Sequence, residues 1–213
     1  LLSNWLKTEH YEVVLHAGDM EAVLPRLIRA LEDPRVGQCY PNFYVANLAS
    51  KFVKVVLSGT GGDELFAGYP WRYFRGLQGH GEDSYFKDYY GFWQRLVDDE
   101  RKPAFFTPDV LRSARPEEPF DIFRSVFEPL RGRIHSREER VNASLYFEMK
   151  TFLHGLLVVE DKLSMAHSLE NRLPFLDNDL VDFALLLPTR VKLQGLTGDT
   201  PVIDEDEPGK QKL

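Results

Sequence analysis

The sequence has 213 residues, of which 43% are hydrophobic and 13% aromatic, enough for one large core or for a domain and a half. Its net charge of −7 offers no long basic stripe, which argues against a duplex nucleic acid as a partner. No apolar run is long enough to cross a bilayer, so a membrane partner is not expected either. Cys39 is the only cysteine, which excludes an internal disulfide and indicates a reducing, cytoplasmic environment.

Residues 1–80 predict a partial α/β layer, because short apolar segments alternate there with helical patterns. YEVVLH at residues 11–16 predicts a short buried strand, and VKVVL at 53–57 predicts a strand covered on both faces, as in parallel sheets. Between them, helices are expected over residues 20–31 and about 42–51. The first helix is indicated by apolar residues at helical spacing, which are Leu24, Leu27, Ile28 and Leu31. In the second helix, Val45, Leu48 and Ala49 are predicted to face inward.

The rest of the chain has a different character. Residues 81–192 show helical segments separated by proline-rich loops and no convincing strand pair, so this part is expected to be helical. Residues 193–213 contain glycines, prolines and the acidic run DEDE, which is typical of an exposed loop. The sequence shows no internal repeat.

A glycine-rich, acidic segment follows the predicted strand: Ser58-Gly59-Thr60-Gly61-Gly62-Asp63-Glu64. Glycines allow a ligand to approach the main chain closely, and successive amide N–H groups can face an anion. Asp63 is then placed to hold Mg²⁺, which prefers oxygen ligands and bridges to phosphates. The segment matches neither the P-loop nor the dinucleotide fingerprint. A plain strand-to-helix turn, with acids at the positive end of a helix dipole, explains it equally well.

A second segment, EDKLSMAHSLENRLPFLDNDLVDFALLLP at residues 160–188, favours a ligand-binding interpretation. Together with VVLSGTGGDELFAGYPWRY at residues 55–73, it resembles the synthetase domain of the glutamine-hydrolysing asparagine synthetases. The resemblance covers residues 10–192 and implies an ATP pyrophosphatase-type parallel sheet, with residues 1–80 as part of its nucleotide-binding layer, followed by a mostly helical half. It also implies ATP and Mg²⁺ as cofactors and activation of a carboxylate, aspartate in that family, as acyl-AMP for amide formation.

The resemblance assigns roles to residues of this chain. Ser58, Gly59, Gly61 and Gly62 would lie along the nucleotide, and Asp63 would bind Mg²⁺. Glu64 would face the amino group of an aspartate-like substrate. Two residues are candidates for the catalytic step. These are Lys212, which sits where the family has a lysine that neutralises phosphate charge, and Thr60.

The chain also departs from the family pattern. The Ser-Gly-Gly-x-Asp-Ser loop that cradles pyrophosphate is not among these residues, and neither is a glutaminase nucleophile. The sequence is therefore expected to be an excerpt of a longer polypeptide that carries the glutaminase domain and allows a homodimer, and to be inactive alone.

Thr60 stands where asparagine synthetases carry an acid, and its hydroxyl is a poor general base. In the related β-lactam synthetases, which use an internal amine, a tyrosine stands there. A second alternative therefore stays open, which is an amide-forming ligase that uses an amine other than ammonia. A degenerate, non-catalytic binding module is the third alternative.

Other residues have simpler explanations. Glu170 and Arg172 are expected to form a structural ion pair, and Glu160 and Asp161 to precede and cap a helix. His154 and His167 match no metal-binding spacing. The aromatic residues at helical spacing are expected to pack in a core; they are Tyr85, Phe86, Tyr89, Tyr90, Phe92 and Trp93.

Overall fold

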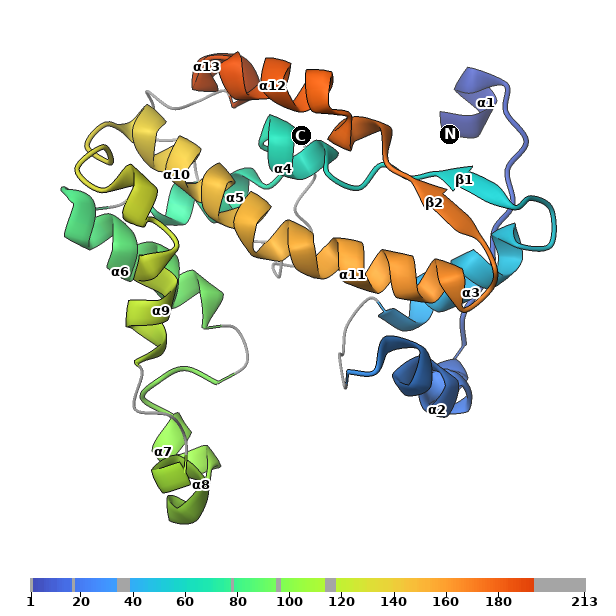
Figure 1. The fold of residues 1–213 in the computed structure, drawn as a ribbon, viewed down its shortest axis with the longest axis horizontal. Helices are drawn as coiled ribbons and strands as arrows, with labels where there is room; N and C mark the ends of the chain where they lie inside the picture. Colours follow the sequence, from blue (N-terminus) through green and yellow to red (C-terminus); the bar gives the residue numbers. More distant parts are fainter. Residues whose placement is uncertain are drawn as a thin grey trace. The chain divides into compact units, whose positions relative to one another are not determined.

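The structure is a computed structural model that describes residues 2–16, 18–33, 39–77, 79–94, 97–113 and 118–193. It is mixed α/β and mostly helical, with a small parallel sheet (Figure 1). Two compact units divide the chain: the first unit combines residues 1–60 with 154–177, and the second combines 61–153 with 178–213. The sequence-based boundaries at residues 80 and 192 stay a prediction. Within the described ranges, no helix is long and apolar enough to cross a membrane.

The first unit contains helices packed around one small core, together with the sheet. Its elements are α1 (Leu2–Leu6), α2 (Asp19–Leu31), α3 (Cys39–Ala49), β1 (Val55–Leu57), most of α11 (Phe152–Met165), β2 (Glu170–Arg172) and the 3-10 turn η2 (Pro174–Leu176). Helices α2, α3 and α11 supply the core side chains, which are Val23, Leu27, Leu31, Cys39, Phe43, Val159 and Leu163. The prediction of a helix over residues 20–31 is confirmed.

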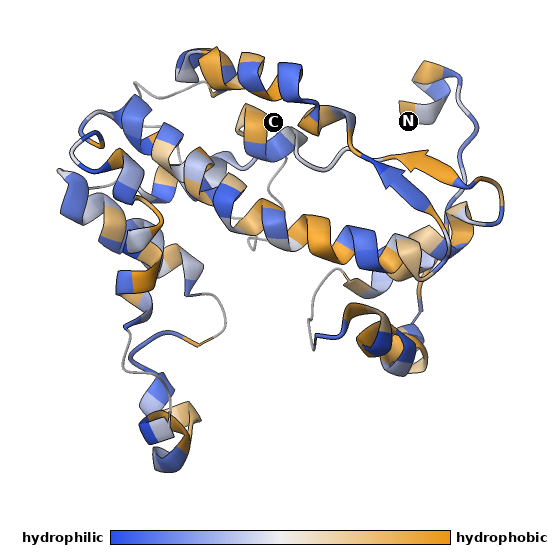
Figure 2. Cartoon of the chain, viewed as in Figure 1, coloured by the Kyte–Doolittle hydropathy of each residue, from blue (hydrophilic) through white to orange (hydrophobic). Residues whose placement is uncertain are grey.

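Strands β1 and β2 pair in parallel, with Val55 opposite Glu170 and Leu57 opposite Arg172. The pairing continues for one more hydrogen bond, since the Ser58 N–H donates to the Arg172 carbonyl at 2.9 Å. Figure 2 shows that β1 is hydrophobic and β2 hydrophilic. Because the strands are parallel, the segments that follow them both leave the same edge of the sheet.

Three expectations for this unit are wrong. Residues 11–16 form no strand, and Tyr11 and Val14 are 56% and 69% exposed, because no described segment pairs with them. β1 is not covered on both faces: Val55 and Leu57 are 41% and 74% exposed. Val45 points outward from α3, whose buried residues are Cys39, Phe43 and Ala46 instead. The helix begins earlier than predicted and turns a different face to the core.

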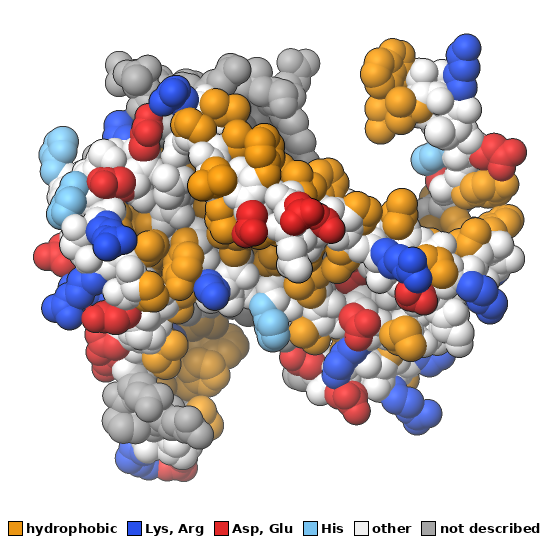
Figure 3. Space-filling model, turned by 45° about the horizontal axis from the view of Figure 1, so that its top comes forward, with side chains coloured by type: hydrophobic (Ala, Val, Ile, Leu, Met, Phe, Trp, Pro, Cys, Tyr) orange, Lys and Arg blue, Asp and Glu red, His pale blue; other side chains and the backbone are white. Residues whose placement is uncertain are grey.

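The second unit is helical, as expected for the middle of the chain. Its elements are α4 (Gly62–Phe66), α5 (Pro70–Arg75), α6 (Glu82–Trp93), α7 (Lys102–Phe105), α8 (Pro108–Ser113), α9 (Pro119–Ser125), the 3-10 turn η1 (Glu128–Leu130), α10 (Arg137–Lys150), α12 (Asn178–Leu186) and α13 (Thr189–Lys192). In α12, the side chain of Phe183 is 57% exposed and that of Leu186 is 84% exposed. Figure 3 shows hydrophobic side chains at the surface on the face that it draws. Among the described residues of 81–192, strand structure occurs at β2, which belongs to the first unit and pairs with β1.

Helix α10 is the central element of the second unit. It begins at a capping box, in which the Ser136 side chain accepts from the Glu139 N–H at 3.2 Å and the Glu139 carboxylate accepts from the Ser136 N–H at 2.7 Å. It packs on aromatic residues of α6 and α9. The predicted packing role is confirmed for Tyr85, Phe86, Tyr89, Tyr90 and Trp93, whereas Phe92 is only partly buried and is not a member of this cluster. The buried core here comprises Tyr85, Phe86, Tyr89, Phe123, Phe127, Ile134, Ala143 and Phe147.

Candidate functional site

The segment after β1 begins with a pair of hydroxyl groups. The side-chain oxygens of Ser58 and Thr60 lie 3.1 Å apart, and the Thr60 N–H donates to the Ser58 hydroxyl at 3.2 Å. Between them, a Cβ placed on Gly59 would meet no atom within 4 Å, so the main chain is open to approach there. Thr60 is thus hydrogen-bonded to a neighbouring hydroxyl and has no ionisable partner in this contact.

Two glycines follow and start the short helix α4. Gly61 is buried and has a φ of 97°, a left-handed conformation that favours glycine. Gly62 is the first residue of α4, which ends after Phe66 at Ala67, a buried residue that also takes a left-handed φ of 62°. Left-handed residues at both ends make α4 a tight, isolated turn of helix.

Asp63 lies on the outer side of α4. Its side chain is exposed, and within the described part of the chain it makes no side-chain hydrogen bond or ion pair. Its carbonyl accepts a hydrogen bond from the Gly68 N–H at 2.9 Å. Its carboxylate lies directly against Gly68, where an added Cβ would fall 1.9 Å from the Asp63 Oδ1 atom. Only glycine at position 68 leaves the carboxylate in this place.

The environment of Asp63 fits a magnesium ion bound together with phosphates. Magnesium is commonly held by one or two carboxylates, with water and phosphate oxygens completing its shell. Asp63 offers such a carboxylate, and no Lys or Arg of the described ranges forms an ion pair with it. No group of three or more His, Cys, Asp or Glu side chains that could hold a metal alone occurs among the described residues. A metal at Asp63 would therefore need oxygens from a ligand.

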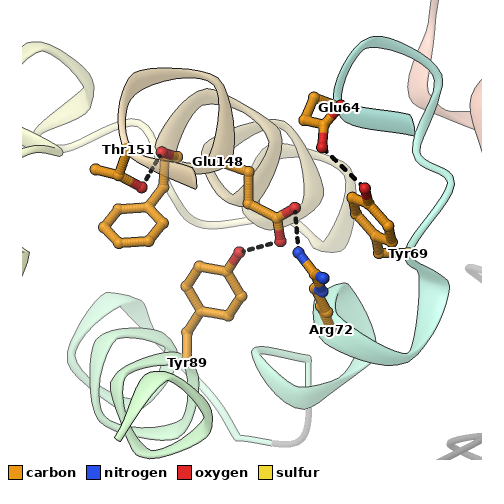
Figure 4. Close-up of polar contacts among 7 residues, drawn as sticks. Glu64, Tyr69, Arg72, Tyr89, Glu148 and Thr151 are labelled. Carbon is orange, nitrogen blue, oxygen red and sulfur yellow. Dashed lines mark hydrogen bonds and ion pairs between the residues drawn. The ribbon is translucent and has the colours of Figure 1, made fainter. Parts of the chain in front are cut away.

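Glu64, the next residue, points inward. Its side chain is 1% exposed, and one carboxylate oxygen accepts a hydrogen bond from the Tyr69 hydroxyl at 2.9 Å (Figure 4). Burial and the nearby Glu64 carboxylate raise the pKa of Tyr69 well above its usual value. The tyrosine therefore stays protonated and remains the donor at any physiological pH.

Tyr69 is connected to a buried ion pair. The Arg72 guanidinium lies over the Tyr69 ring, 3.8 Å from its centroid, and Arg72 Nη1 is 3.2 Å from an oxygen of Glu148 on α10. The other Glu148 oxygen accepts a hydrogen bond from the Tyr89 hydroxyl on α6 at 2.9 Å (Figure 4). Arg72 and Glu148 are 4% and 0% exposed. Helices α5, α6 and α10 thus meet at one charged group inside the second unit.

The buried position changes the acidity of Glu148. Burial raises its pKa to about 7, and the nearby Glu64 charge acts in the same direction. The Arg72 charge and the Tyr89 hydrogen bond lower it, but they offset only part of the cost of removing the carboxylate from water. Glu148 therefore exchanges a proton in the neutral pH range.

Some predicted site residues are brought together and others are not. Ser58 and Thr60 are in contact, whereas the adjacent acids Asp63 and Glu64 have opposite environments, one exposed and one buried. Lys212 lies outside the described residues. The roles assigned to these residues stay predictions.

Two other roles that the sequence predicted can be compared directly with the structure. The predicted pair of Glu170 and Arg172 is confirmed, with a distance of 2.9 Å between its charged atoms. The capping role expected for Glu160 and Asp161 is wrong, because both lie inside α11 rather than before a helix.

One pattern in the sequence could have indicated the buried network. On α10, Val141, Leu145 and Glu148 recur at the three- to four-residue spacing of a core-facing stripe. A charged residue in such a stripe needs a buried partner of opposite charge. The sequence does not say which of the many arginines that partner is.

Comparison with known proteins identifies relatives across most of the chain. Residues 1–205 match the family model described as asparagine synthase. A putative glutamine-hydrolysing asparagine synthetase of Mycobacterium tuberculosis is 30% identical over 223 aligned positions, which cover 88% of this chain and 32% of that protein. Asparagine synthetase 1 of Bacillus subtilis, also glutamine-hydrolysing, is 25% identical, with 90% of this chain and 34% of that protein covered. The chain thus spans about a third of the length of these curated relatives.

Proposed function

The chain belongs to the asparagine synthase family, and from this membership we propose that it is the synthetase part of an ATP-dependent amidotransferase. The proposed reaction activates a carboxylate, with aspartate as the first candidate, as acyl-AMP, and an amine then displaces AMP to form an amide. The proposal includes an ATP pyrophosphatase-type sheet, ATP and Mg²⁺ as cofactors, and a glutaminase domain on the same full-length chain.

The observation that carries the proposal is the position of the Ser58–Asp63 segment in a chain of this family. It follows directly on β1, at the carboxyl end of a parallel strand, which is where open α/β sheets bind their ligands. The main chain at Gly59 is open, and the Asp63 carboxylate is exposed and makes no side-chain hydrogen bond or ion pair within the described residues. These features suit contact with a nucleotide and its metal.

Different residues of the chain would contact the nucleotide, the metal ion and the phosphates. Ser58 and Gly59 would lie along the nucleotide, and Asp63 would hold Mg²⁺. The ion, when bound, neutralises charge on the phosphate oxygens. Lys212 would add a positive charge beside the phosphates as pyrophosphate leaves, an electrostatic role that needs no proton transfer.

One observation favours a second candidate, an amide-forming ligase of the same superfamily that uses an amine other than ammonia. The position at which the family carries an acid holds Thr60, whose hydroxyl is hydrogen-bonded to Ser58. A hydroxyl is too weak a base to take the proton that is released when ammonia attacks the acyl group near neutral pH. Amide formation tested with ammonia, hydroxylamine and amino acids as acceptors separates the two candidates, since the second predicts little product with ammonia.

Pyrophosphate exchange with the complete protein tests the activation step. The assay presents a series of carboxylic acids, and we expect exchange with aspartate or a close analogue that Asp63→Asn abolishes. Asp109→Asn, which changes another exposed acid far along the chain on α8, is the matched control and is expected to keep the activity. Undiminished exchange in Asp63→Asn would remove the metal assignment. No exchange with any acid would favour a non-catalytic binding module.

A further inference from the structure

Three buried charged groups lie near one another in the second unit. They are the carboxylates of Glu64 and Glu148 and the guanidinium of Arg72, and these residues are 1%, 0% and 4% exposed (Figure 4). Arg140, the other buried charged residue of the described ranges, lies about two turns before Glu148 on α10 and donates to the Gly79 carbonyl at 2.6 Å. The group of three therefore combines two acids with one cation.

The cation is placed unequally between the two acids. Arg72 Nη1 lies 3.2 Å from a carboxylate oxygen of Glu148, which is an ion-pair distance. On the side of Glu64, the Tyr69 ring lies 3.8 Å from the guanidinium, and the Tyr69 hydroxyl donates to Glu64 at 2.9 Å. Among the residues that the structure describes, no Lys, Arg or His forms an ion pair with Glu64. The Glu64 carboxylate is thus hydrogen-bonded but not neutralised.

We propose that Glu148 holds the Arg72 cation away from Glu64, and that the Glu64 carboxylate is thereby kept available for a substrate that carries an ammonium group. Arg72 and Glu148 are then positioning residues, which determine specificity without touching the substrate. The inference rests on the proposed function and on the contact with the substrate amino group that the family resemblance gives to Glu64. It adds the reason why this carboxylate is free to make that contact.

The charge of Glu64 favours a cationic ligand. A buried carboxylate without a cation is costly, because its charge has lost most of its contact with water. An ammonium group that reaches it forms an ion pair at low dielectric, where the attraction is much stronger than in water. One oxygen of Glu64 accepts from Tyr69, and the other has no hydrogen-bond partner in the described part of the chain, so it can accept from the ammonium group. A pair between Arg72 and Glu64 would remove this gain.

Glu148 is well placed to hold the cation. Both of its oxygens are used, since one faces Arg72 and the other accepts from the Tyr89 hydroxyl at 2.9 Å. The guanidinium is also confined by an aromatic ring, because it lies 4.3 Å from the centroid of Phe152. The two acids interact, since the charge of Glu64 raises the pKa of Glu148. A change in the charge of Glu148 or Arg72 therefore acts on Glu64.

The test uses the complete protein in pyrophosphate exchange at about pH 8, above the pKa of Glu148, so that its carboxylate is ionised. The measured quantity is the preference for aspartate, or for another amino acid that supports exchange, over its analogue without the amino group, which is succinate for aspartate. The preference is the ratio of the two kcat/KM values. The variants are Glu148→Met, the double variant with Arg72→Met, and Glu64→Gln. Glu128→Met, which removes an exposed acid paired with Arg131, is the matched control.

In Glu148→Met the Arg72 cation is released and neutralises Glu64. The preference for aspartate should fall by at least about tenfold, through a higher KM for aspartate and an unchanged KM for succinate. The double variant also removes the cation and should regain most of the preference, whereas general damage to the fold would leave it at least as impaired. Glu64→Gln should lose the preference and Glu128→Met should keep it. An unchanged preference in Glu148→Met, or one as low in the double variant, would overturn the inference.

Two further outcomes separate the inference from the proposed function. If exchange occurs but Glu64→Gln keeps the full preference, Glu64 does not meet the ammonium group, and the inference alone fails. If the unaltered protein supports exchange with no acid, the proposed function fails, and a crystal structure of Glu148→Met tests the role of Glu148 instead. It is expected to show the Arg72 guanidinium within about 4 Å of the Glu64 carboxylate. A guanidinium that stays apart from Glu64 contradicts the inference.

Discussion

The guanidinium of Arg72 and the carboxylate of Glu148 form an ion pair at 3.2 Å in the interior of the second unit, with side chains 5% and 0% exposed. The arginine comes from α5, directly after the glycine-acid segment, and the glutamate from the last turn of α10. The Arg72 guanidinium also lies 4.3 Å from the centroid of the Phe152 ring. The pair links the segment that holds Asp63 to the helix on which the unit is built.

Removal of one partner of this pair is expected to be costly. In Arg72→Met, Glu148 stays buried without a cation, which typically reduces the free energy of unfolding by about 3–5 kcal/mol. The double variant Arg72→Met with Glu148→Met should be more stable than Arg72→Met alone, because no uncompensated charge remains. Urea unfolding of the complete protein measures the free energy of unfolding of the single and the double variant.

The control is the exposed pair of Arg131 and Glu128, whose charged atoms are 3.3 Å apart. Arg131→Met is expected to leave stability almost unchanged, since water screens an exposed pair. Equal effects of Arg72→Met and Arg131→Met would show that the buried pair has no special role in stability.

Stability should depend on pH through Glu148. Its pKa is raised from 4.5 to about 7 by burial, so the folded protein holds this proton more tightly than the unfolded chain does. The resulting stabilisation is fully present below pH 4.5 and is lost as the pH rises toward 7, with a total on the order of 3 kcal/mol. Above pH 7 both states are ionised and no further change is expected from this group.

The contribution of Glu148 is isolated by comparison with Glu148→Gln. Urea unfolding at several pH values between 5 and 8 should show a fall in stability for the unaltered protein and a flatter profile for the variant. Subtraction of the two profiles removes the contribution of the other carboxyl groups to the pH dependence. One of these groups is Glu139, whose lowered pKa acts in the opposite direction. Parallel profiles would mean that Glu148 does not titrate in this range.

Gly68 is expected to be essential for the position of the Asp63 carboxylate. In Gly68→Ala the new Cβ would fall 1.9 Å from Asp63 Oδ1, so the carboxylate must move. Loss of support for a metal ligand typically costs roughly 10- to 100-fold in affinity, and Mg·ATP binding by the complete protein should weaken by this factor. Isothermal titration calorimetry measures the change.

Gly91→Ala is the matched control for this experiment. Gly91 lies on the exposed side of α6, and a Cβ there meets no atom within 4 Å. Alanine in a helix is expected to raise stability by about 0.5–1 kcal/mol and to leave Mg·ATP binding unchanged. Unchanged binding in Gly68→Ala as well would show that the Asp63 carboxylate plays no part in holding the metal.

The sequence predicted those parts of the fold that depend on local pattern. The spacing of Leu27 and Leu31 predicted α2, and the apolar run ending at Leu57 predicted β1. β2 was not predictable, because Glu-Asn-Arg has no strand pattern and pairs with a strand far away in the sequence. YEVVLH has the composition of a strand but no partner among the described residues, and pairing rather than composition makes a strand.

For the site, sequence motifs placed Asp63 and Glu64 side by side but did not show that one is exposed and the other buried. That difference arises from Tyr69, Arg72 and Glu148, which come from three separate segments. Family resemblance transfers roles between aligned positions, whereas burial depends on side chains packed around each position. The buried network could not be read from any single motif.

The central claim is that the carboxylate substrate is activated as acyl-AMP. It is tested most directly by incubation of the complete protein with ATP, Mg²⁺, an amine and aspartate labelled with ¹⁸O in its side-chain carboxylate. Attack of that carboxylate on the α-phosphorus transfers one labelled oxygen to AMP when the amide forms, and ³¹P NMR detects it as an isotope shift. The account predicts labelled AMP and unlabelled pyrophosphate. Label in inorganic phosphate with release of ADP, or amide formation without labelled AMP, would contradict it.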